Sequence, residues 1–341
     1  MPLEAPSRQP EVYEFGPGMR LGIRGGAHAR AHFRAEYGDC TVSGDPPGAR
    51  VEVAFEAVHR SPAGATVIRG GHKTARWAVA FRLPPAEALE ASIEVGGRPR
   101  SFGLSLVQGY FVEPLLSLAA PVSGRVLLPG AALEQDGGAL VILGRSRSGK
   151  TSLAVRAIAA GRKVLGDDQV LVDTSGRCFA FPRRPRVYSD LAETAPAAYG
   201  RLGATARASL AGRGLVRAAS RGLVAPPLSL DRSRLGGAHA PGSLPIRRLV
   251  VIHRDDEEDA LRARHLDTDR VVSRTLELLG AQRAHLPSAP AWADELLLTR
   301  EREAEQLRQA FAGVAAEELR VPARWNAVRA VATLAERLDL E

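Results

Sequence analysis

A chain of 341 residues is long enough for two domains, or for one large domain with an appendage. Its 45% hydrophobic and 25% charged residues are typical of a globular protein and exclude a disordered one. No run of 18 or more apolar residues indicates a membrane span, and the first residues lack the basic start and apolar core of a signal peptide. The two cysteines, Cys40 and Cys178, have the spacing of neither a metal site nor a disulfide framework. We therefore expect a soluble, cytoplasmic protein with no membrane partner.

The formal net charge of +8 raises the hypothesis of a nucleic-acid partner. However, the arginines are spread along the whole chain, and the aromatic residues do not interleave with them. A general bias toward Ala, Arg, Gly and Pro would give the same basicity. Charge alone is therefore weak support for nucleic-acid binding.

The first 105 residues predict a β-rich N-terminal domain. Apolar residues alternate with others over residues 51–55 and 77–83, as in half-buried strands. Ile93 and Val95 lead into Gly96-Gly97, which favours a hairpin turn. Residues 70–73, Gly-Gly-His-Lys, could reach a ligand, but a solvated loop is the commoner explanation for such a stretch. We expect this domain to recognise the partner or acceptor of the protein.

Residues 106–280 predict an α/β domain. A short helix over residues 110–120 precedes two strands, over residues 125–133 and 139–143, which flank a hairpin turn at Asp136-Gly137-Gly138. The second strand enters a glycine-rich loop, and a helical pattern follows the loop and stops at Gly161. The loop reads Gly144, Arg145, Ser146, Arg147, Ser148, Gly149, Lys150, Thr151 and Ser152.

The spacing Gly-x-x-x-x-Gly-Lys-Thr between a strand and a helix is typical of a phosphate-binding loop. Gly144 and Gly149 permit torsion angles and a close backbone approach that side chains would block. The N–H groups at the helix N-terminus form an anion site, Lys150 supplies positive charge for the β- and γ-phosphates, and Thr151 a hydroxyl for Mg²⁺. The loop therefore predicts a bound nucleoside triphosphate.

The reaction for which the nucleotide is used depends on acidic residues near the loop. The sequence offers two candidate positions for such residues. Asp167 and Asp168 follow a short strand eighteen residues beyond Lys150, where one carboxylate could ligate Mg²⁺ and the other accept a proton from a hydroxyl. Asp255 follows an apolar strand over residues 249–252, but it begins an acidic run that more often indicates a solvated turn.

Arginines after the acidic pair are candidates for a phosphate clamp, because guanidinium groups match phosphate oxygens. These candidates are Arg183, Arg184, Arg186 and Arg221. Further along, residues 268–279 predict a helix that ends at Gly280, and residues 281–341 predict a helical C-terminal segment. In that segment residues 296–311 form one amphipathic helix, and Pro322 begins another at the first-turn position that proline favours.

Residues 144–151 and 160–170 together resemble the catalytic domain of bacterial HPr kinase/phosphorylase and its HPr-kinase-related relatives. In that family a phosphate-binding loop, a helix ending in glycine and a short strand ending in Asp-Asp recur at closely similar spacing. The resemblance covers about residues 105–280. It implies a P-loop kinase fold of the type shared with phosphoenolpyruvate carboxykinase, and it also allows a homo-oligomer.

Residue by residue, the resemblance implies that Lys150 binds phosphates and that Thr151 ligates Mg²⁺. It implies that Asp168 is the proton acceptor and Asp167 the metal-side partner, although the two roles are open to exchange. The sequence departs from the family at residues 128–131, where Leu-Pro-Gly-Ala stands in place of a segment that usually holds a histidine. This departure argues against the reverse, phosphorylase reaction, and the unrelated N-terminal domain argues against HPr itself as substrate.

We therefore expect an ATP-dependent kinase that uses ATP and Mg²⁺ and transfers the γ-phosphoryl group to a hydroxyl. The acceptor is a small molecule, a peptide or a protein serine, and nothing in the sequence identifies it. The alternative is a nucleotide-binding regulatory or switch protein without kinase activity. A GTPase is disfavoured because the chain has no clear Asn-Lys-x-Asp motif.

Overall fold

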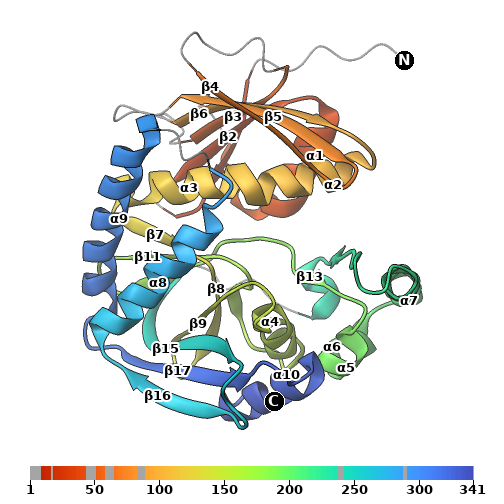
Figure 1. The fold of residues 1–341 in the computed structure, drawn as a ribbon, viewed down its shortest axis with the longest axis vertical. Helices are drawn as coiled ribbons and strands as arrows, with labels where there is room; N and C mark the ends of the chain where they lie inside the picture. Colours follow the sequence, from red (N-terminus) through yellow and green to blue (C-terminus); the bar gives the residue numbers. More distant parts are fainter. Residues whose placement is uncertain are drawn as a thin grey trace. The chain divides into compact units, whose positions relative to one another are not determined.

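The chain folds into two units, each built from two separate stretches of sequence (Figure 1). The first unit contains Met1–Leu127 and Leu279–Leu307, and the second contains Leu128–Leu278 and Arg308–Glu341. The structure is a computed structural model and describes residues 9–16, 18–43, 51–57, 65–82, 89–236, 242–286 and 290–340. It is mixed α/β, 41% helical and 32% strand, with mixed sheets, as the expected α/β class requires. The boundaries differ from those predicted at residues 105 and 280, because residues 281–341 are shared between the units and form no separate extension.

A six-stranded sheet with the order β1-β2-β3-β6-β5-β4 forms the centre of the first unit. Its strands are β1 (Glu11–Glu14), β2 (Arg20–Gly25), β3 (Val51–Phe55), β4 (Thr66–His72), β5 (Ala75–Arg82) and β6 (Leu89–Gly96). β3 pairs in parallel with both of its neighbours, whereas β4, β5 and β6 form an antiparallel series. The β-rich character of this region is therefore confirmed, with one mixed sheet and packed helices.

The hairpin predicted at Gly96-Gly97 is wrong. β6 ends at Gly96, and after a short turn the chain enters the helix α2 (Arg100–Val107). Gly97 has φ +97°, and a Cβ there would lie 2.0 Å from the backbone oxygen of Thr74. The glycine is thus explained by close approach to the β4–β5 turn and not by a reversal of β6.

A long helical stretch follows β6, and it is longer than the predicted helix over residues 110–120. It consists of α2, a π-helical turn (Gln108–Val112), α3 (Glu113–Ala119) and a 3₁₀ turn (Ala120–Ser123). By length and composition Arg100–Ser123 would suffice to cross a membrane, but 72% of its most apolar window is buried in the protein. Such burial is typical of a core helix. The helix α1 (Ala27–Tyr37) adds Phe33 and Tyr37 to the same core.

The second unit is built on a larger mixed sheet. Its strands are β8 (Gly130–Gln135), β9 (Gly138–Gly144), β10 (Val164–Gly166), β11 (Val170–Asp173), β12 (Arg177–Phe179), β15 (Ser243–Asp255), β16 (Arg262–Leu266) and β17 (Ala315–Pro322); β7 (Arg125–Leu128) lies where the division into units falls. Part of the strand order is β10-β8-β9-β15. β17 pairs in parallel with β15, and the two strands lie side by side in Figure 1. The hairpin predicted at Asp136-Gly137-Gly138 joins β8 to β9 and is confirmed.

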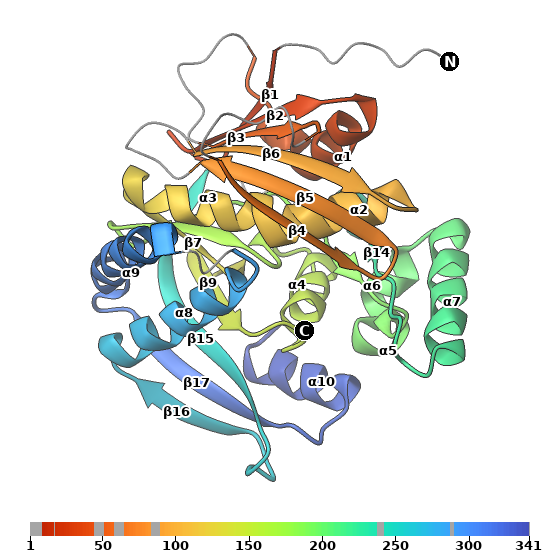
Figure 2. The same ribbon diagram turned by 45° about the horizontal axis from the view of Figure 1, so that its top comes forward.

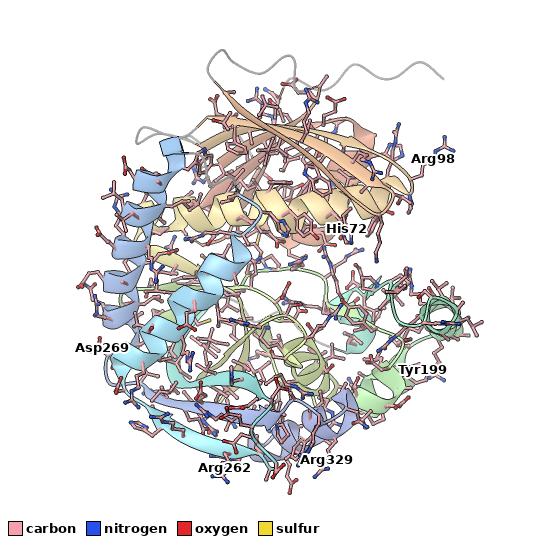
Figure 3. All side chains as sticks on the ribbon, viewed as in Figure 1. His72, Arg98, Tyr199, Arg262, Asp269 and Arg329 are labelled. Atoms are coloured by element: carbon pink, nitrogen blue, oxygen red, sulfur yellow. The ribbon has the colours of Figure 1, made fainter. Side chains whose placement is uncertain are left out.

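Several helices belong to the second unit. They are α4 (Lys150–Ala159), α5 (Leu191–Thr194), α6 (Pro196–Arg201), α7 (Ala204–Ala219), most of α8 (Thr268–Gln282), the end of α9 (Pro290–Phe311) and α10 (Ala327–Arg337). A small ladder of β13 (Arg186–Val187) and β14 (Leu228–Ser229) lies beside them. One hydrophobic core joins β9, α4, β15 and α10 through Ile142, Leu153, Val250 and Val331. Figure 3 labels Tyr199 on α6, whose ring lies 5.4 Å from the guanidinium of Arg207 on α7.

Two predictions for the C-terminal region are wrong. Pro322 ends the strand β17, which the sequence did not predict, and the helix begins later at Ala327 with Asn326 as its cap. Proline lacks an N–H and serves as well at the end of a strand as at the first turn of a helix. Gly280 does not stop α8, which continues to Gln282. The helix predicted over residues 296–311 is confirmed as part of α9.

Within the first unit, Arg283 forms a buried ion pair inside the segment Leu279–Leu307 and also binds the helix α3. Arg283 Nη1 donates to Glu303 Oε2 at 2.9 Å, and its Nη2 donates to Ser117 O at 3.1 Å. Burial raises the pKa of Glu303, while the hydrogen bond and charge of Arg283 oppose that rise.

We predict that Arg283→Met destabilises the protein by about 3–5 kcal/mol, because it leaves the Glu303 carboxylate buried without its partner. Urea unfolding measures the change in the midpoint. Arg302→Met, one residue before Glu303 but on the exposed side of α9, is the matched control and should shift stability by less than about 0.5 kcal/mol. Equal effects of the two substitutions would contradict the role given to Arg283.

Candidate phosphate-binding site

The loop between β9 and α4 has the backbone geometry that a phosphate-binding loop requires. Gly149 has φ +103°, a conformation that residues with a side chain rarely adopt, and it directly precedes the first residue of α4. Arg147 has φ +67°, and Ser148 N donates to Arg145 O at 3.2 Å, so the loop turns tightly on itself. The N-terminus of a ten-residue helix therefore opens onto a compact loop.

Gly144 stands where the loop and the neighbouring strand come closest. A Cβ on Gly144 would lie 2.8 Å from Ser148 Oγ and 3.0 Å from Ile252 O. Ile252 belongs to β15 and pairs with Gly144 in the parallel register. Any side chain at this position would force the loop away from the sheet.

Lys150 is buried and held against the loop. Its Nζ donates to Gly144 O at 2.7 Å, to Arg145 O at 2.9 Å and to Ser148 Oγ at 3.4 Å. Burial lowers the pKa of Lys150, and the negative charges of Asp168 and Asp167 oppose that effect. The ammonium group thus lies against the loop and interacts electrostatically with two carboxylates.

The other residues of the loop divide by exposure. Arg145, Ser146 and Arg147 are exposed, and Ser148 is buried. Thr151 and Ser152 are half-buried in the first turn of α4. Thr151, which the resemblance expects to ligate the metal, therefore lies at the end of the helix that faces the loop.

Asp167 and Asp168 lie at the same edge of the sheet as the loop. β8 is antiparallel to both β9 and β10, so β9 and β10 run in the same direction. In this register Gly166 pairs with Ala132, and Ala132 pairs with Val141. Gly166, the last residue of β10, is therefore level with Val141, three residues before the end of β9, and the acidic pair continues from it toward the end of the sheet that carries the loop.

A tight turn sets the direction of the two carboxylates. A Cβ on Gly166 would lie 2.1 Å from Gln169 O and 2.7 Å from Val170 Cγ1. Only glycine fits this turn, which sends Asp167 inward and Asp168 outward. Asp167 is 2% exposed, whereas the side chain of Asp168 is 49% exposed.

The two environments separate the pKa values of the pair. Burial raises the pKa of Asp167 to about 6, and the charge of Asp168 adds to the rise, while Arg232, Arg183 and Arg186 oppose it. Desolvation would also raise the pKa of Asp168, but the charges of Arg183, Lys150 and Arg186 outweigh it and lower that pKa below its usual range. Asp167 Oδ1 has no hydrogen-bond partner among the described residues.

The four candidate clamp arginines do not lie together. Arg183 Nη1 donates to Asp168 Oδ2 at 2.6 Å, and Arg186 acts electrostatically on both carboxylates. Arg184 instead pairs with Asp231 at 3.6 Å. Arg221 is exposed beyond the end of α7, and in the described part of the chain it forms no ion pair with Asp167 or Asp168. The structure thus joins Arg183 and Arg186 to the acidic pair, whereas the ion pair given for Arg184 is with Asp231 and Arg221 is exposed.

The structure also gives the surroundings of Asp255 and Pro129, two residues that the sequence analysis singled out. Asp255 accepts hydrogen bonds from Arg320 Nη1 at 3.3 Å and from Glu257 N at 2.9 Å, so it stabilises the turn after β15. Pro129 directly precedes Gly130, which pairs with Leu143 beside the loop. The residues 128–131 therefore lie next to the phosphate-binding loop, with proline where the resembling family usually has an imidazole.

Two contributions to the site were not anticipated from the sequence. The helix α10, with Val331 3.3 Å from the position of a Cβ on Gly149, packs beside α4 (Figures 1 and 2). On the same helix Arg329, labelled in Figure 3, lies 4.1 Å above the ring of Trp325. The second contribution is Arg232, whose charge opposes the burial of Asp167. An amphipathic stripe predicted α10 itself, but no local signal could show what it covers.

A scan of the chain against protein-family models finds no match, and a search of curated proteins finds none either. The chemistry of the site therefore rests on its geometry. A concave loop at a helix N-terminus, a buried ammonium group and nearby guanidinium groups can bind a polyphosphate. A half-exposed, ionised carboxylate beside them, that of Asp168, can accept a proton.

The donor set also fits Mg²⁺. Within the described ranges no group of three or more His, Cys, Asp or Glu side chains could hold a metal ion by itself. Mg²⁺ does not require one, because it is commonly held by one or two carboxylates together with substrate phosphates and water. Asp167 Oδ1, which is buried and has no hydrogen-bond partner among the described residues, can supply one such carboxylate, and Thr151 could add its hydroxyl.

We predict that Gly166→Ala lowers the free energy of unfolding by about 1–3 kcal/mol, because the new methyl group overlaps the Gln169 carbonyl and must displace the turn. Urea denaturation measures the loss. Gly200→Ala is the control, since a Cβ there meets nothing within 4 Å and the residue lies in the helix α6. It should leave stability unchanged or slightly higher.

We also predict that Asp167→Asn stabilises the protein when nucleotide and Mg²⁺ are absent. The folded pKa of Asp167, about 6, lies above its ordinary value of 3.8, so ionisation opposes folding once the pH exceeds 3.8. The gain should be near zero below pH 4, grow between pH 4 and 6, and reach roughly 2–3 kcal/mol above pH 6. Thermal unfolding of both proteins across this range checks the sign, and a gain that is independent of pH would contradict it.

Proposed function

We propose that the chain is an ATP-dependent kinase that transfers the γ-phosphoryl group of ATP to a hydroxyl with the help of Mg²⁺. The observation that carries the proposal is the position of Asp167 and Asp168, at the same sheet edge as the phosphate-binding loop and within the electrostatic reach of Lys150. A loop alone supports only nucleotide binding, whereas two carboxylates of different exposure beside it supply what phosphoryl transfer to a hydroxyl needs.

The phosphates would be held by the loop amides, by Lys150 and by arginines near the acidic pair. Lys150 Nζ donates to carbonyl oxygens of its own loop, and phosphate oxygens would take the place of these acceptors when ATP binds. Arg183 is suited to the γ-phosphate because it already lies at the exposed carboxylate where the acceptor would approach. Its planar guanidinium can contact a carboxylate and a phosphate in turn.

The difference in exposure supports separate roles for the two carboxylates. The buried Asp167, with its unpartnered Oδ1, would hold Mg²⁺ together with Thr151, because a cation offsets the cost of burying its charge. Mg²⁺, when bound, neutralises charge on the phosphates. The half-exposed Asp168 can reach an incoming hydroxyl.

In the transfer step the acceptor oxygen attacks the γ-phosphorus, and the bond from that phosphorus to the β,γ-bridging oxygen breaks. ADP leaves, and the hydroxyl proton passes to Asp168. The low pKa of Asp168 does not prevent this role, because the transition state is loose and the hydroxyl needs little activation. The carboxylate needs only to be ionised and correctly placed.

The resemblance to HPr-kinase-related enzymes supports the same reading. The loop, the helix ending at Gly161 and the strand ending in the acidic pair follow one another as that family's pattern requires. Pro129 beside the loop favours a kinase that works in one direction over a kinase/phosphorylase. The mixed sheet is compatible with a P-loop kinase fold of this type, and the first unit is the proposed source of acceptor specificity.

We predict that Asp168→Asn lowers phosphoryl transfer by about 10²–10⁴-fold while ATP binding persists, because the amide cannot accept the hydroxyl proton. Lys150→Ala should lower transfer by on the order of 10²-fold or more and weaken ATP binding as well. Transfer from [γ-³²P]ATP to pools of metabolites and peptides, with Mg²⁺ present, measures both effects.

Two matched controls come from the same region. Asp136→Asn replaces an exposed carboxylate at the opposite end of β9, and Lys163→Ala removes a lysine that pairs with Glu134 at 3.1 Å on the surface. Both should retain wild-type transfer. Full activity in a folded Asp168→Asn protein would refute the proton acceptor. Mg²⁺-dependent ATP binding without transfer to any acceptor would favour the nucleotide-gated regulatory protein.

A further inference from the structure

A single arginine, Arg232, lies between the strand that carries the acidic pair and the arginine that contacts it. It is 8% exposed and belongs to the 3₁₀ turn Arg232–Leu235, 64 residues beyond Asp168 in the chain. Asp231 fixes the start of this turn, because its Oδ1 accepts from Ser233 N at 3.0 Å and from Ser233 Oγ at 2.7 Å. These hydrogen bonds fix the start of the turn from which the Arg232 side chain extends.

The two terminal nitrogens of Arg232 reach two different segments. Nη1 donates to Val164 O at 3.1 Å, at the start of β10, and Nη2 donates to Arg183 O at 3.3 Å. β10 is the terminal strand in the sheet order, paired with β8 on one side, so its carbonyls need a partner from elsewhere. One guanidinium thus holds the strand that leads into Asp167 and the backbone of Arg183, the residue that pairs with Asp168.

We propose that Arg232 is a positioning residue for the acidic pair: it joins β10 to the Arg183 segment and so fixes Asp167 for Mg²⁺ and Arg183 for the phosphate. The purpose assigned to Arg232 rests on the proposed kinase function, whereas the hydrogen bonds of Arg232 do not depend on that function. Arg232 is no candidate for the phosphate itself, because its side chain is buried and both of its terminal nitrogens lie on backbone carbonyls.

The positive charge of Arg232 also stabilises the ionised carboxylate of Asp167. Among the groups that oppose the raised pKa of Asp167, Arg232 contributes most, ahead of Arg183 and Arg186. A cation held on backbone carbonyls keeps its place while Arg183 exchanges partners during a reaction. Arg232 therefore offsets the buried charge of Asp167 at every stage.

The test compares Arg232→Met with wild type in the full chain, using a non-hydrolysable ATP analogue in isothermal titration calorimetry with Mg²⁺ and then with EDTA. We expect the affinity in EDTA to change by less than about threefold, because the two hydrogen bonds of Arg232 go to Val164 and Arg183, which lie outside the loop. The gain in affinity that Mg²⁺ provides should fall by about tenfold, the effect of a lost charge-assisted hydrogen bond. Hydrogen exchange in peptides covering residues 163–169 and 181–186 should become faster by about tenfold or more.

Arg234→Met is the matched control, since Arg234 lies in the same turn with its side chain exposed, and it should match wild type in both readouts. If Arg232→Met does not fold, Arg232→Lys carries the test. Lysine keeps the charge but cannot fork to two carbonyls, so we expect about a threefold loss of the Mg²⁺ effect and faster exchange in one or both peptides.

An Arg232→Met protein with unchanged exchange and an unchanged Mg²⁺ effect would overturn the inference. Equal losses of affinity with and without Mg²⁺ would also overturn it, since they indicate a general loss of structure. If wild type binds no nucleotide at all, the proposed function fails, and the exchange measurement alone then decides whether Arg232 holds the two segments.

Discussion

The second unit depends on keeping charged groups close together in a place where water is largely excluded. Lys150 and Asp167 are both buried. Burial lowers the pKa of Lys150 and raises the pKa of Asp167, so it favours the neutral form of each side chain. The charges of Asp168 and Asp167 oppose this effect at Lys150, and the charges of Arg232, Arg183 and Arg186 oppose it at Asp167. The sheet makes this arrangement possible, because β9 and β10 end at one edge and deliver the lysine and the carboxylates to the same place.

Features confined to a short stretch of sequence could be predicted. The loop from Gly144 to Thr151 and the acidic pair eighteen residues later are each defined by neighbours in the chain, and the strands and helix between them lie where the pattern indicates. Arg232 and Val331 could not be found in this way. The contact of Arg232 with Val164 spans 68 residues, and one arginine among so many carries no signal in the sequence.

The errors have a common physical cause, which is that glycine and proline permit several structures and tertiary packing selects one. Gly97 serves a close approach to Thr74 instead of a hairpin, and Pro322 ends a strand instead of starting a helix. Gly280 stays within α8, since a single glycine costs a helix only about 1 kcal/mol and packing can outweigh that cost. The division into two discontinuous units escaped prediction for a related reason: contacts such as Arg283 with Ser117 join segments 166 residues apart.

The tight turn at Gly166 explains why two adjacent carboxylates can have different duties. Both carboxylates follow β10 in this turn, which leaves Asp167 buried and the side chain of Asp168 half-exposed. One side is the interior, where a carboxylate gains only if a cation joins it, and the other is the surface, where a carboxylate meets incoming molecules. A pair of this kind would therefore bind metal with one member and receive a proton with the other. Because the asymmetry comes from the backbone, any residue that fixes the backbone of β10 also governs the chemistry of the pair.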